Sequence, residues 1–555
     1  MKTNLEFGLT ENGQAYEVLK MTTNDATEVK IPSVFEGKPV VVIKKAAFKC
    51  NASIQKVFIP DSVTIIEGDA FSECVALKSV SFSKGVTKIG SYAFAFCESL
   101  EEIIIPDSVT EMGKGVFYDC KALKKVKLPE GIKDVKEKMF QNCASLERIE
   151  LPDSVTKLGG PFALLGGGHG GVFEGCKSLK EVKLSDKIKK LHDFTFGGCI
   201  SLTHITLPAS LTSMDDIFDV YGQDCKNLPW PELPKGIQKI KSAKNCIVKE
   251  LKIPKSVTDL GNNDGAFCGA KGLERITVEE GNKNYKSDGN CLIRTKDNAL
   301  ILVGPGGVIP DYVTNIVPHA FESCTGLKHI VLPKSLSSIN RGAFAHFKEL
   351  ETIEIPEGVT EISDFTFSHC TGLKNIVLPK SLQSIDYGAF LRCHQLKIEI
   401  PENVTNIAQG GKWSSQCGAF EACTGTQITV SSKNKTYKMD GNCLINIPTK
   451  TLVKGFADSV IPSYVKVIAR GAFSEVKDLV SMVIPEGVKE IEGLAFNECS
   501  SLTNLVLPKS LKKIGIRSFE QCKELEIDIS AQVELEQWAF QGCKKISIDG
   551  IPVGE

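Results

Sequence analysis

The stretch from Leu100 to Leu123, LEEIIIPDSVTEMGKGVFYDCKAL, decides the fold, because the chain repeats it along most of its 555 residues. As a template it reads L-xx-I-x-I-P-xx-V-xx-I-G-xx-A-F-xx-C-xx-L, and the next copy begins at the last leucine. Self-similarity at a short fixed period is typical of arrays in which each repeat stacks on its neighbours. The period therefore outweighs chain length as a guide to domain number.

The anchor phenylalanine of the template marks the period. Successive anchors are 23 residues apart from Phe48 to Phe140, from Phe321 to Phe390 and from Phe473 to Phe519. Two insertions, glycine-rich residues 159–171 and residues 408–416, enter at the same point of the repeat, between V-xx-I and A-F. Both insertions are therefore expected to protrude from the same edge of the array.

The residue types of the template predict how each copy folds. In I-x-I, apolar positions alternate with outward ones, which indicates a strand with one buried face. Proline ends this strand because it has no N–H, V-xx-I is a second short apolar segment, and A-F-xx-C-xx-L is expected to turn the chain back through a helical turn. One copy cannot bury its own apolar side chains, but copies stacked at about 4.8 Å bury a continuous core. The sequence predicts an α/β fold dominated by strands: a right-handed solenoid of about twenty repeats, forming a curved rod about 100 Å long.

Two longer segments interrupt the short repeats and match each other at an offset of 152 residues. Each contains Tyr-Lys-x-Asp-Gly-Asn-Cys-Leu-Ile, starting at Tyr285 in the first segment and at Tyr437 in the second. Asp-Gly-Asn is turn chemistry and precedes a β-prone run. We therefore interpret each segment as a repeat enlarged by a hairpin.

The pattern divides the chain into six parts. They are an N-terminal cap at 1–46, a first array at 47–267 with an irregular region at 209–250, an enlarged unit at 268–320, a second array at 321–420, an enlarged unit at 421–472, and a third array with a C-terminal cap at 473–555. Caps are expected because a solenoid otherwise exposes the apolar cross-section of its first and last repeats.

This template resembles the repeat of the BspA-like leucine-rich repeat family. The enlarged Tyr-x-x-Asp-Gly-x-x-Leu units and the run Gly-Lys-Pro-Val-Val-Val-Ile at 37–43 resemble that family as well. The match extends from about residue 29 to 543 and departs from the pattern between about 209 and 250. The resemblance implies a leucine-rich repeat solenoid. Members of the family are mostly surface or secreted proteins of bacteria and anaerobic protists, implicated in adhesion and protein binding.

Composition and charge exclude several kinds of partner. With 66 basic and 67 acidic residues, the net charge of −1 argues against binding to nucleic acid or to an anionic membrane surface. The first residues form no apolar signal region, and no stretch approaches about 18 apolar residues, so we expect no membrane insertion. As written, the sequence predicts a cytoplasmic protein. The alternative is a cell-surface or secreted protein whose signal peptide is missing from this sequence.

Cysteine is frequent, with twenty residues, and most occupy one slot of the repeat. That slot also accepts Phe347 and Val476, which is how a position for a small buried hydrophobe behaves. We therefore predict a ladder of reduced structural cysteines, with disulfides or a metal as the alternatives; clustered C-x-x-C pairs typical of zinc are absent from the sequence. The ladder consists of Cys74, Cys97, Cys120, Cys143, Cys176, Cys199, Cys324, Cys370, Cys393, Cys423, Cys499, Cys522 and Cys543.

A partner is expected to contact the outward positions of the I-x-I strand and the two insertions, because the other template positions are architectural. Outward positions are charged and mixed in sign in the first half of the chain, and carry Asn, Ser or His beside valines in the second half. Neutral columns that merely pack in register are the alternative to a binding groove. The candidates are Lys125, Lys127, Arg148, Glu150, His329, Val331, Asn375, Val377, Asn504 and Val506 on strands, with Phe162 and Trp413 in the insertions.

Catalytic signals are weak throughout the sequence. The eight histidines form no H-E-x-x-H motif, and the glycine-rich insertion lacks the G-K-[ST] of a phosphate loop. His346 and His369 hold the same slot of successive repeats and are expected to stack as surface residues. We predict a non-enzymatic scaffold that binds a protein or peptide, without cofactor or metal. The alternatives are an adhesin that binds host protein or glycan, and an enzyme that uses 209–250 or the glycine-rich insertion.

Overall fold

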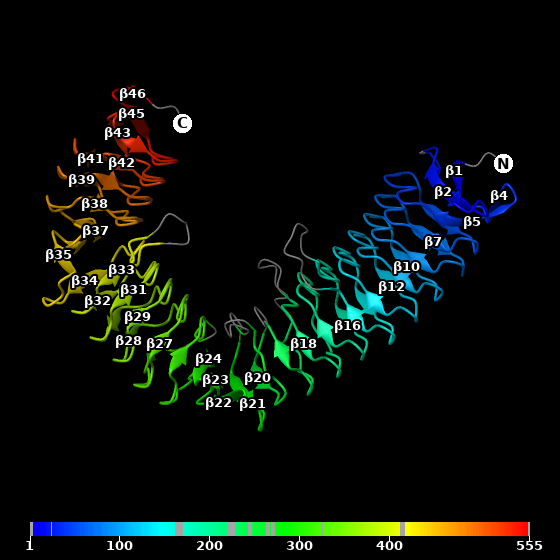
Figure 1. The fold of residues 1–555 in the computed structure, drawn as a ribbon, viewed down its shortest axis with the longest axis horizontal. Helices are drawn as coiled ribbons and strands as arrows, with labels where there is room; N and C mark the ends of the chain where they lie inside the picture. Colours follow the sequence, from blue (N-terminus) through cyan, green and yellow to red (C-terminus); the bar gives the residue numbers. More distant parts are fainter. Residues whose placement is uncertain are drawn as a thin grey trace. The chain divides into compact units, whose positions relative to one another are not determined.

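Stacked β-coils form the protein, as the computed structural model shows (Figure 1). The chain divides into two compact units, Met1–Asn284 (unit 1) and Tyr285–Glu555 (unit 2). Over the described residues the repeats make about 21 turns, which confirms the predicted leucine-rich repeat solenoid. The structure describes residues 4–23, 25–160, 170–218, 228–241, 247–261, 267, 272–322, 324, 326–410 and 417–552.

The I-x-I segments form the main strand row, in which successive repeats pair in parallel. Ile103 and Ile105 are 2% and 1% exposed, whereas Ile104 between them is 58% exposed, as the alternation predicts. In unit 1 this row consists of β3 (Glu28–Lys30), β6 (Lys56–Ile59), β8 (Ser79–Phe82), β10 (Glu102–Ile104), β12 (Lys125–Lys127), β14 (Arg148–Glu150), β16 (Glu181–Lys183), β20 (Glu250–Ile253) and β21 (Arg275–Val278). In unit 2 it consists of β26 (His329–Ile330), β28 (Thr352–Glu354), β30 (Asn375–Val377), β32 (Lys397–Ile400), β34 (Gln427–Val430), β39 (Ser481–Val483), β41 (Asn504–Val506), β43 (Glu526–Ile529) and β45 (Lys545–Ile548), with β46 (Ile551–Pro552) antiparallel to the last.

The V-xx-I segments form a second strand row of very short strands. In unit 1 the N-terminal strands join it, and it comprises β1 (Leu5–Leu9), β2 (Tyr16–Met21), β4 (Val34–Phe35), β5 (Lys38–Ile43), β7 (Ile65–Ile66), β9 (Lys88–Ile89), β11 (Glu111–Met112), β13 (Asp134–Val135), β15 (Lys157–Leu158), β17 (Lys190–Leu191), β18 (Ser213–Met214) and β19 (Lys239–Ile240). In unit 2 it comprises β25 (Asn315–Ile316), β27 (Ser338–Ile339), β29 (Glu361–Ile362), β31 (Ser384–Ile385), β33 (Asn406–Ile407), β38 (Val467–Ile468), β40 (Glu490–Ile491), β42 (Lys513–Ile514) and β44 (Glu534–Leu535).

The two enlarged repeats contain antiparallel hairpins, as predicted. In the first, β22 (Tyr285–Asp288), β23 (Cys291–Arg294) and β24 (Ala299–Val303) pair in order, and β24 then pairs in parallel with β25. The second repeats this arrangement with β35 (Tyr437–Asp440), β36 (Cys443–Asn446) and β37 (Thr451–Lys454), followed by β38. Both hairpins lie in unit 2.

The A-F-xx-C segment is not helical, and the described residues contain no helix. Left-handed residues flank the anchor phenylalanines; beside Phe117 they are Gly115 (φ 57°) and Asp119 (φ 58°), whereas Phe173 and Phe420, which follow the insertions, have one on the C-terminal side alone. Positive φ ends helical hydrogen bonding, so the segment forms consecutive turns. Its N–H groups instead bond the next repeat, as in Phe117 N–H to the carbonyl of Met139 at 3.0 Å. The prediction of a helical turn was therefore wrong. The segment does turn the chain back toward the next repeat, as expected, but it does so through consecutive non-helical turns.

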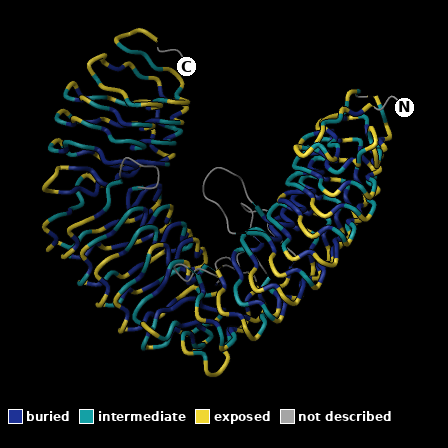
Figure 2. The backbone as a smooth tube through the Cα atoms, turned by 45° about the vertical axis from the view of Figure 1, so that its right-hand side comes forward, coloured by how far each residue is buried: buried dark blue, intermediate teal, exposed yellow. Residues whose placement is uncertain are grey.

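Figure 2 shows buried backbone along the coils. The core within the repeat arrays contains two columns of stacked side chains. Anchor phenylalanines of successive repeats lie face to face, for example Phe71 and Phe94 with ring centroids 5.2 Å apart. Beside them, each of the thirteen ladder cysteines donates its thiol to a carbonyl of the preceding repeat at 2.8–3.3 Å. The seventeen described cysteines are free thiols. The ladder slot thus satisfies a buried carbonyl as well as filling space.

Candidate functional site

The outward positions of the main strand row form the candidate binding face. Each repeat presents two such positions, which we call the first and second outward slots; in β10 they are Glu102 and Ile104. Parallel pairing places equivalent slots of neighbouring repeats directly opposite each other, as in Glu102 opposite Lys125. Side chains that are distant in sequence therefore form continuous columns along each unit.

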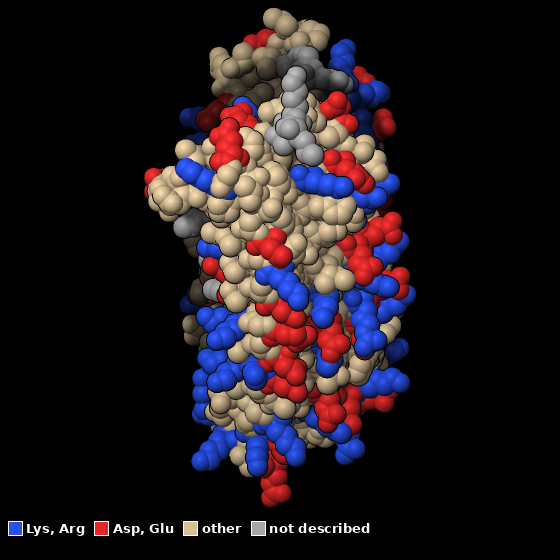
Figure 3. All heavy atoms as spheres, turned by 90° about the vertical axis from the view of Figure 1, so that its right-hand side faces the viewer, with Lys and Arg blue, Asp and Glu red and all other residues tan. Residues whose placement is uncertain are grey.

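In unit 1 these columns are charged and mixed in sign (Figure 3). Lys125 and Lys127 are exposed on β12, and neither makes an ion pair within the described residues. Arg148 lies 3.4 Å from Glu181, and Glu150 pairs with Lys183. The predicted candidates of unit 1 thus lie on one face, but only the two lysines hold charges that neighbouring repeats leave without a partner.

In unit 2 the same slots carry polar side chains beside exposed valines. Val331 is 86% exposed, Val377 57% and Val506 55%. Val506 lies directly opposite Val483, itself 65% exposed, so these two form a continuous apolar pair. His329, Asn375 and Asn504 occupy the first outward slots of their repeats and are exposed. Phe162 and Trp413 lie outside the described residues.

The main strand row of unit 1 is interrupted after β16. In the described part of the chain, β16 pairs only with β14, and β20 only with β21. Between them, residues 203–207 form no strand and no main-chain hydrogen bond to another described repeat. The next repeat, Leu228-Pro-Trp-Pro-Glu-Leu-Pro234, fits the template L-xx-I-x-I-P with Pro231 in the first isoleucine slot. Pro229 and Pro231 have no N–H to donate to the preceding repeat, although Pro229 forms an isolated parallel bridge with Ile247 on the other side.

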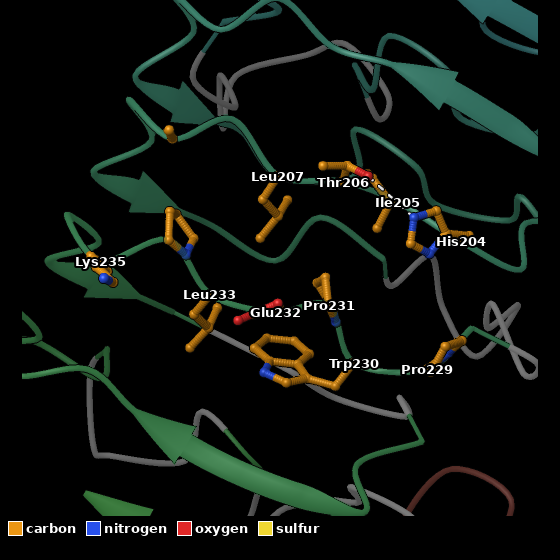
Figure 4. A pocket seen from close by; sticks show the side chains of 12 residues that line it. His204, Ile205, Thr206, Leu207, Pro229, Trp230, Pro231, Glu232, Leu233 and Lys235 are labelled. Carbon is orange, nitrogen blue, oxygen red and sulfur yellow. Dashed lines mark hydrogen bonds between the residues drawn. The ribbon is translucent and has the colours of Figure 1, made fainter. Parts of the chain in front are cut away.

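The repeats that contribute 203–207 and 228–234 to the main strand row separate there, while they remain paired at the second row. There, Ser213 and Met214 of β18 lie opposite Lys239 and Ile240 of β19. The separation leaves a cavity of about 440 Å³ on the candidate binding face, within the size range of ligand pockets. It is lined by His204, Ile205, Thr206, Leu207, Ala209 and the segment 229–235 (Figure 4).

Trp230 occupies the first outward slot at this cavity. Its main-chain N–H donates to the carbonyl of Ile247 at 2.8 Å, and its ring meets Phe267 edge to face at 6.1 Å between centroids. The indole Nε1 is buried and has no hydrogen-bond acceptor among the residues that the structure describes. A buried donor left unpaired costs free energy. Sequence reasoning missed Trp230, although proline in a strand slot was the signal that could have found it.

Two other polar clusters lie outside the main strand row. Asp215 is 3% exposed and lies 3.2 Å from the Lys190 ammonium and 3.1 Å from that of Lys241. His346 and His369 stack with ring centroids 4.7 Å apart, as the shared slot predicted. Across the residues that the structure describes, no group of three or more His, Cys, Asp or Glu side chains is arranged to hold a metal. Nor does any described segment form a helix that could cross a membrane.

Comparison with known proteins identifies the repeat. The BspA type leucine-rich repeat region matches residues 41–161, 169–274, 221–291, 307–417 and 453–552, and no curated protein matches the chain. A Treponema pallidum leucine-rich repeat protein is 31% identical over 36% of this chain and 88% of its own (TM-score 0.32). A leucine-rich cell surface protein of Faecalibacterium prausnitzii is 26% identical over 78% of this chain and 94% of its own (TM-score 0.37). A leucine-rich repeat protein of Bacteroides ovatus is 19% identical over 99% of both chains (TM-score 0.39). Since the family match spans most of the sequence, the chain belongs to the BspA-type leucine-rich repeat family.

Proposed function

We propose that this protein is a non-enzymatic scaffold that binds an extended segment of another protein across the main strand row of unit 1, centred on the cavity at Trp230. The observation that carries this proposal is the cavity lined by Trp230, on the candidate binding face, where the strand ladder is open. An extended peptide supplies carbonyl acceptors at regular spacing, and it can pair with strand backbone that lacks a neighbour.

The surroundings of Trp230 favour a peptide over a small polar molecule. Ile205 and Leu207 line the cavity as apolar wall, and Leu233 is only partly buried there (Figure 4). Tryptophan in such a setting is the residue type most often found to dominate binding energy at protein interfaces. Four repeats before Trp230, at about 20 Å for the usual strand spacing, Lys125 and Lys127 offer unpaired positive charge. A partner segment with acidic residues toward one end fits both features.

Selection from a displayed library of random peptides tests the proposal, with the purified protein as bait. Peptides chosen by the wild type are expected to lose binding to Trp230→Ala, because the substitution removes both the ring and the donor. Trp230→Phe keeps a ring against Phe267 but has no N–H, so it separates packing from hydrogen bonding. Lys125→Glu with Lys127→Glu is expected to weaken the same peptides in a salt-dependent manner.

Matched controls use the same changes elsewhere on the chain. Trp538→Ala removes a tryptophan that is 52% exposed far along the sequence in unit 2, and Lys157→Glu reverses a charge on the second strand row. Circular dichroism of each variant reports whether the fold is intact. Selected peptides that bind the Trp230 variants and the lysine reversals as tightly as they bind wild type would reject this face as the binding site.

A further inference from the structure

Residues 203–207, on one side of the cavity at Trp230, keep the form of a strand although no repeat pairs with them. Ile205 and Leu207 are 4% and 8% exposed, whereas His204 and Thr206 are exposed, which is the alternation of the main strand row. Within the described part of the chain, the N–H and C=O groups of 203–207 make no main-chain hydrogen bond. The segment therefore presents an unpaired strand edge to the cavity.

The opposite side of the cavity is a strand edge without donors (Figure 4). Pro229 forms a parallel bridge with Ile247, and the Trp230 N–H donates to the Ile247 carbonyl at 2.8 Å. Because main-chain groups alternate in direction along a strand, the carbonyls of Pro229 and Pro231 point the other way, toward 203–207. Neither proline has an N–H, so at these positions this edge accepts hydrogen bonds but donates none.

The two prolines explain why the chain does not close this part of the ladder by itself. Pro231 stands where a regular repeat has an isoleucine such as Ile103, and at Ile103 the strands β10 and β12 pair directly. A residue with an N–H would donate to 203–207 and draw the two segments together, which proline cannot do. Pairing of β18 with β19 meanwhile holds the same two repeats together at the second strand row. Pro229 and Pro231 thus act as spacers in the main strand row.

We propose that Pro229 and Pro231 keep this cavity open for one extended strand of the partner protein, which inserts between the two repeats and completes the main strand row. The inference rests on the proposed function and specifies how the partner is recognised, namely through its main chain. The inserted strand pairs with 203–207 along one edge and donates N–H groups to the two proline carbonyls along the other. Five strand residues span about 16 Å, so the inserted part of the partner is a short segment without proline at its paired positions.

Amide-to-ester exchange along a peptide selected by the wild-type protein tests the inserted strand. Each exchange removes one N–H without adding bulk and leaves the side chains in place. Since both edges of an inserted strand are paired, exchange at each of several consecutive residues is expected to weaken binding about fivefold or more. Loss at alternate residues only would indicate pairing along a single edge and would overturn insertion. Hydrogen exchange of the full chain supplies a second readout, because the N–H groups of 203–207 should become protected when the peptide binds.

Pro231→Ile tests the role of the spacer. The variant restores the residue of the template and its N–H, so the two repeats should close on each other: 203–207 should be protected without peptide, and the peptide should bind about tenfold more weakly or worse. Pro254→Ala is the matched control, because Pro254 follows the paired strand β20.

The two proposals fail in different ways. If Trp230→Ala abolished binding while ester exchange had no effect at any residue, the partner would bind the cavity through its side chains; insertion would be rejected and the proposed function would stand. If neither change affected binding, both proposals would be rejected. The ester series uses the wild-type protein, so it decides the question even where Pro231→Ile does not fold.

Discussion

Substitution of a ladder cysteine separates its two roles, filling space and donating a hydrogen bond. Cys143 is fully buried, and its thiol lies 3.1 Å from the Phe117 carbonyl of the preceding repeat. The ladder slot holds Val476 elsewhere in the chain, where no thiol is present, and that residue is 3% exposed. Comparing Cys143→Val with Cys143→Ala therefore asks whether the slot needs volume or a donor.

The structure sets the expected magnitudes. Cys143→Ala removes buried apolar surface comparable to one methylene, about 0.8 kcal/mol, and leaves a small cavity worth about 0.5 kcal/mol. Loss of the thiol hydrogen bond adds about 0.5–1 kcal/mol, although the Phe117 carbonyl keeps its bond from the Cys120 N–H. We expect Cys143→Ala to cost about 2 kcal/mol of unfolding free energy and Cys143→Val only about 0.5–1 kcal/mol.

Urea denaturation followed by far-UV circular dichroism measures both variants. The slope of the unfolding free energy against urea concentration must be the same for both variants and wild type. A changed slope would indicate that the repeat array unfolds in parts, and the free energies could then not be compared. If Cys143→Val cost as much as Cys143→Ala, the hydrogen bond would be the main contribution of the slot. If both variants were as stable as wild type, the ladder would contribute nothing, and the account of the core given above would be wrong.

Three further outcomes are expected. Burial alone would raise the pKa of Asp215, but contacts with His192, Lys241 and Lys190 hold this pKa at about 2. The ionised carboxylate therefore stabilises the folded state above about pH 4, and this stabilisation is lost as the pH falls toward 2. Asp215→Asn should cost about 2 kcal/mol of unfolding free energy at neutral pH and almost nothing near pH 2. Burial and the neighbouring Glu361 raise the pKa of Asp386 to about 6, so ionisation of this carboxyl destabilises the folded state at higher pH. Asp386→Asn should stabilise the protein by about 1 kcal/mol at neutral pH, and the gain should shrink as the pH falls from 6 to 4. Denaturation series at each pH measure both variants. Alkylation of the denatured, unreduced protein should add twenty labels by mass, and among the described cysteines Cys50 should react first in the native state because it is exposed; a count far below twenty would indicate disulfides.

The solenoid could be predicted because its signal is repeated many times. Alternation of Ile103, Ile104 and Ile105 recurs in most copies, so chance variation at any one position does not obscure the buried face. The helical turn was wrong because A-F-xx-C has the apolar spacing of a helix, whereas the backbone at Asp119 and its equivalents takes positive φ. Glycine marks some of these positions, but Asp, Glu, Asn and His occupy others, so residue type alone does not reveal the conformation.

The hydrogen bond of the cysteine ladder was hidden from the sequence for a related reason. Exchange of cysteine with valine or phenylalanine reports that the slot is apolar, but it does not report which carbonyl a thiol faces. That contact crosses from Cys143 to Phe117 and depends on how two repeats stack. The cavity at Trp230 likewise depends on the separation of two repeats, although Pro231 in the strand slot could have marked the place where the ladder ends.

The two enlarged repeats provide an internal comparison of buried charge. At the offset of 152 residues, Leu302 of the first corresponds to Lys454 of the second, and both are buried. Within the described part of the chain the Lys454 ammonium has no hydrogen-bond acceptor, and burial lowers its pKa. Glu421, also buried, is a nearby charge for both Lys454 and Arg470. Since an apolar residue serves the core at Leu302, buried charge in the second copy is not required by the fold and lowers stability unless it is compensated.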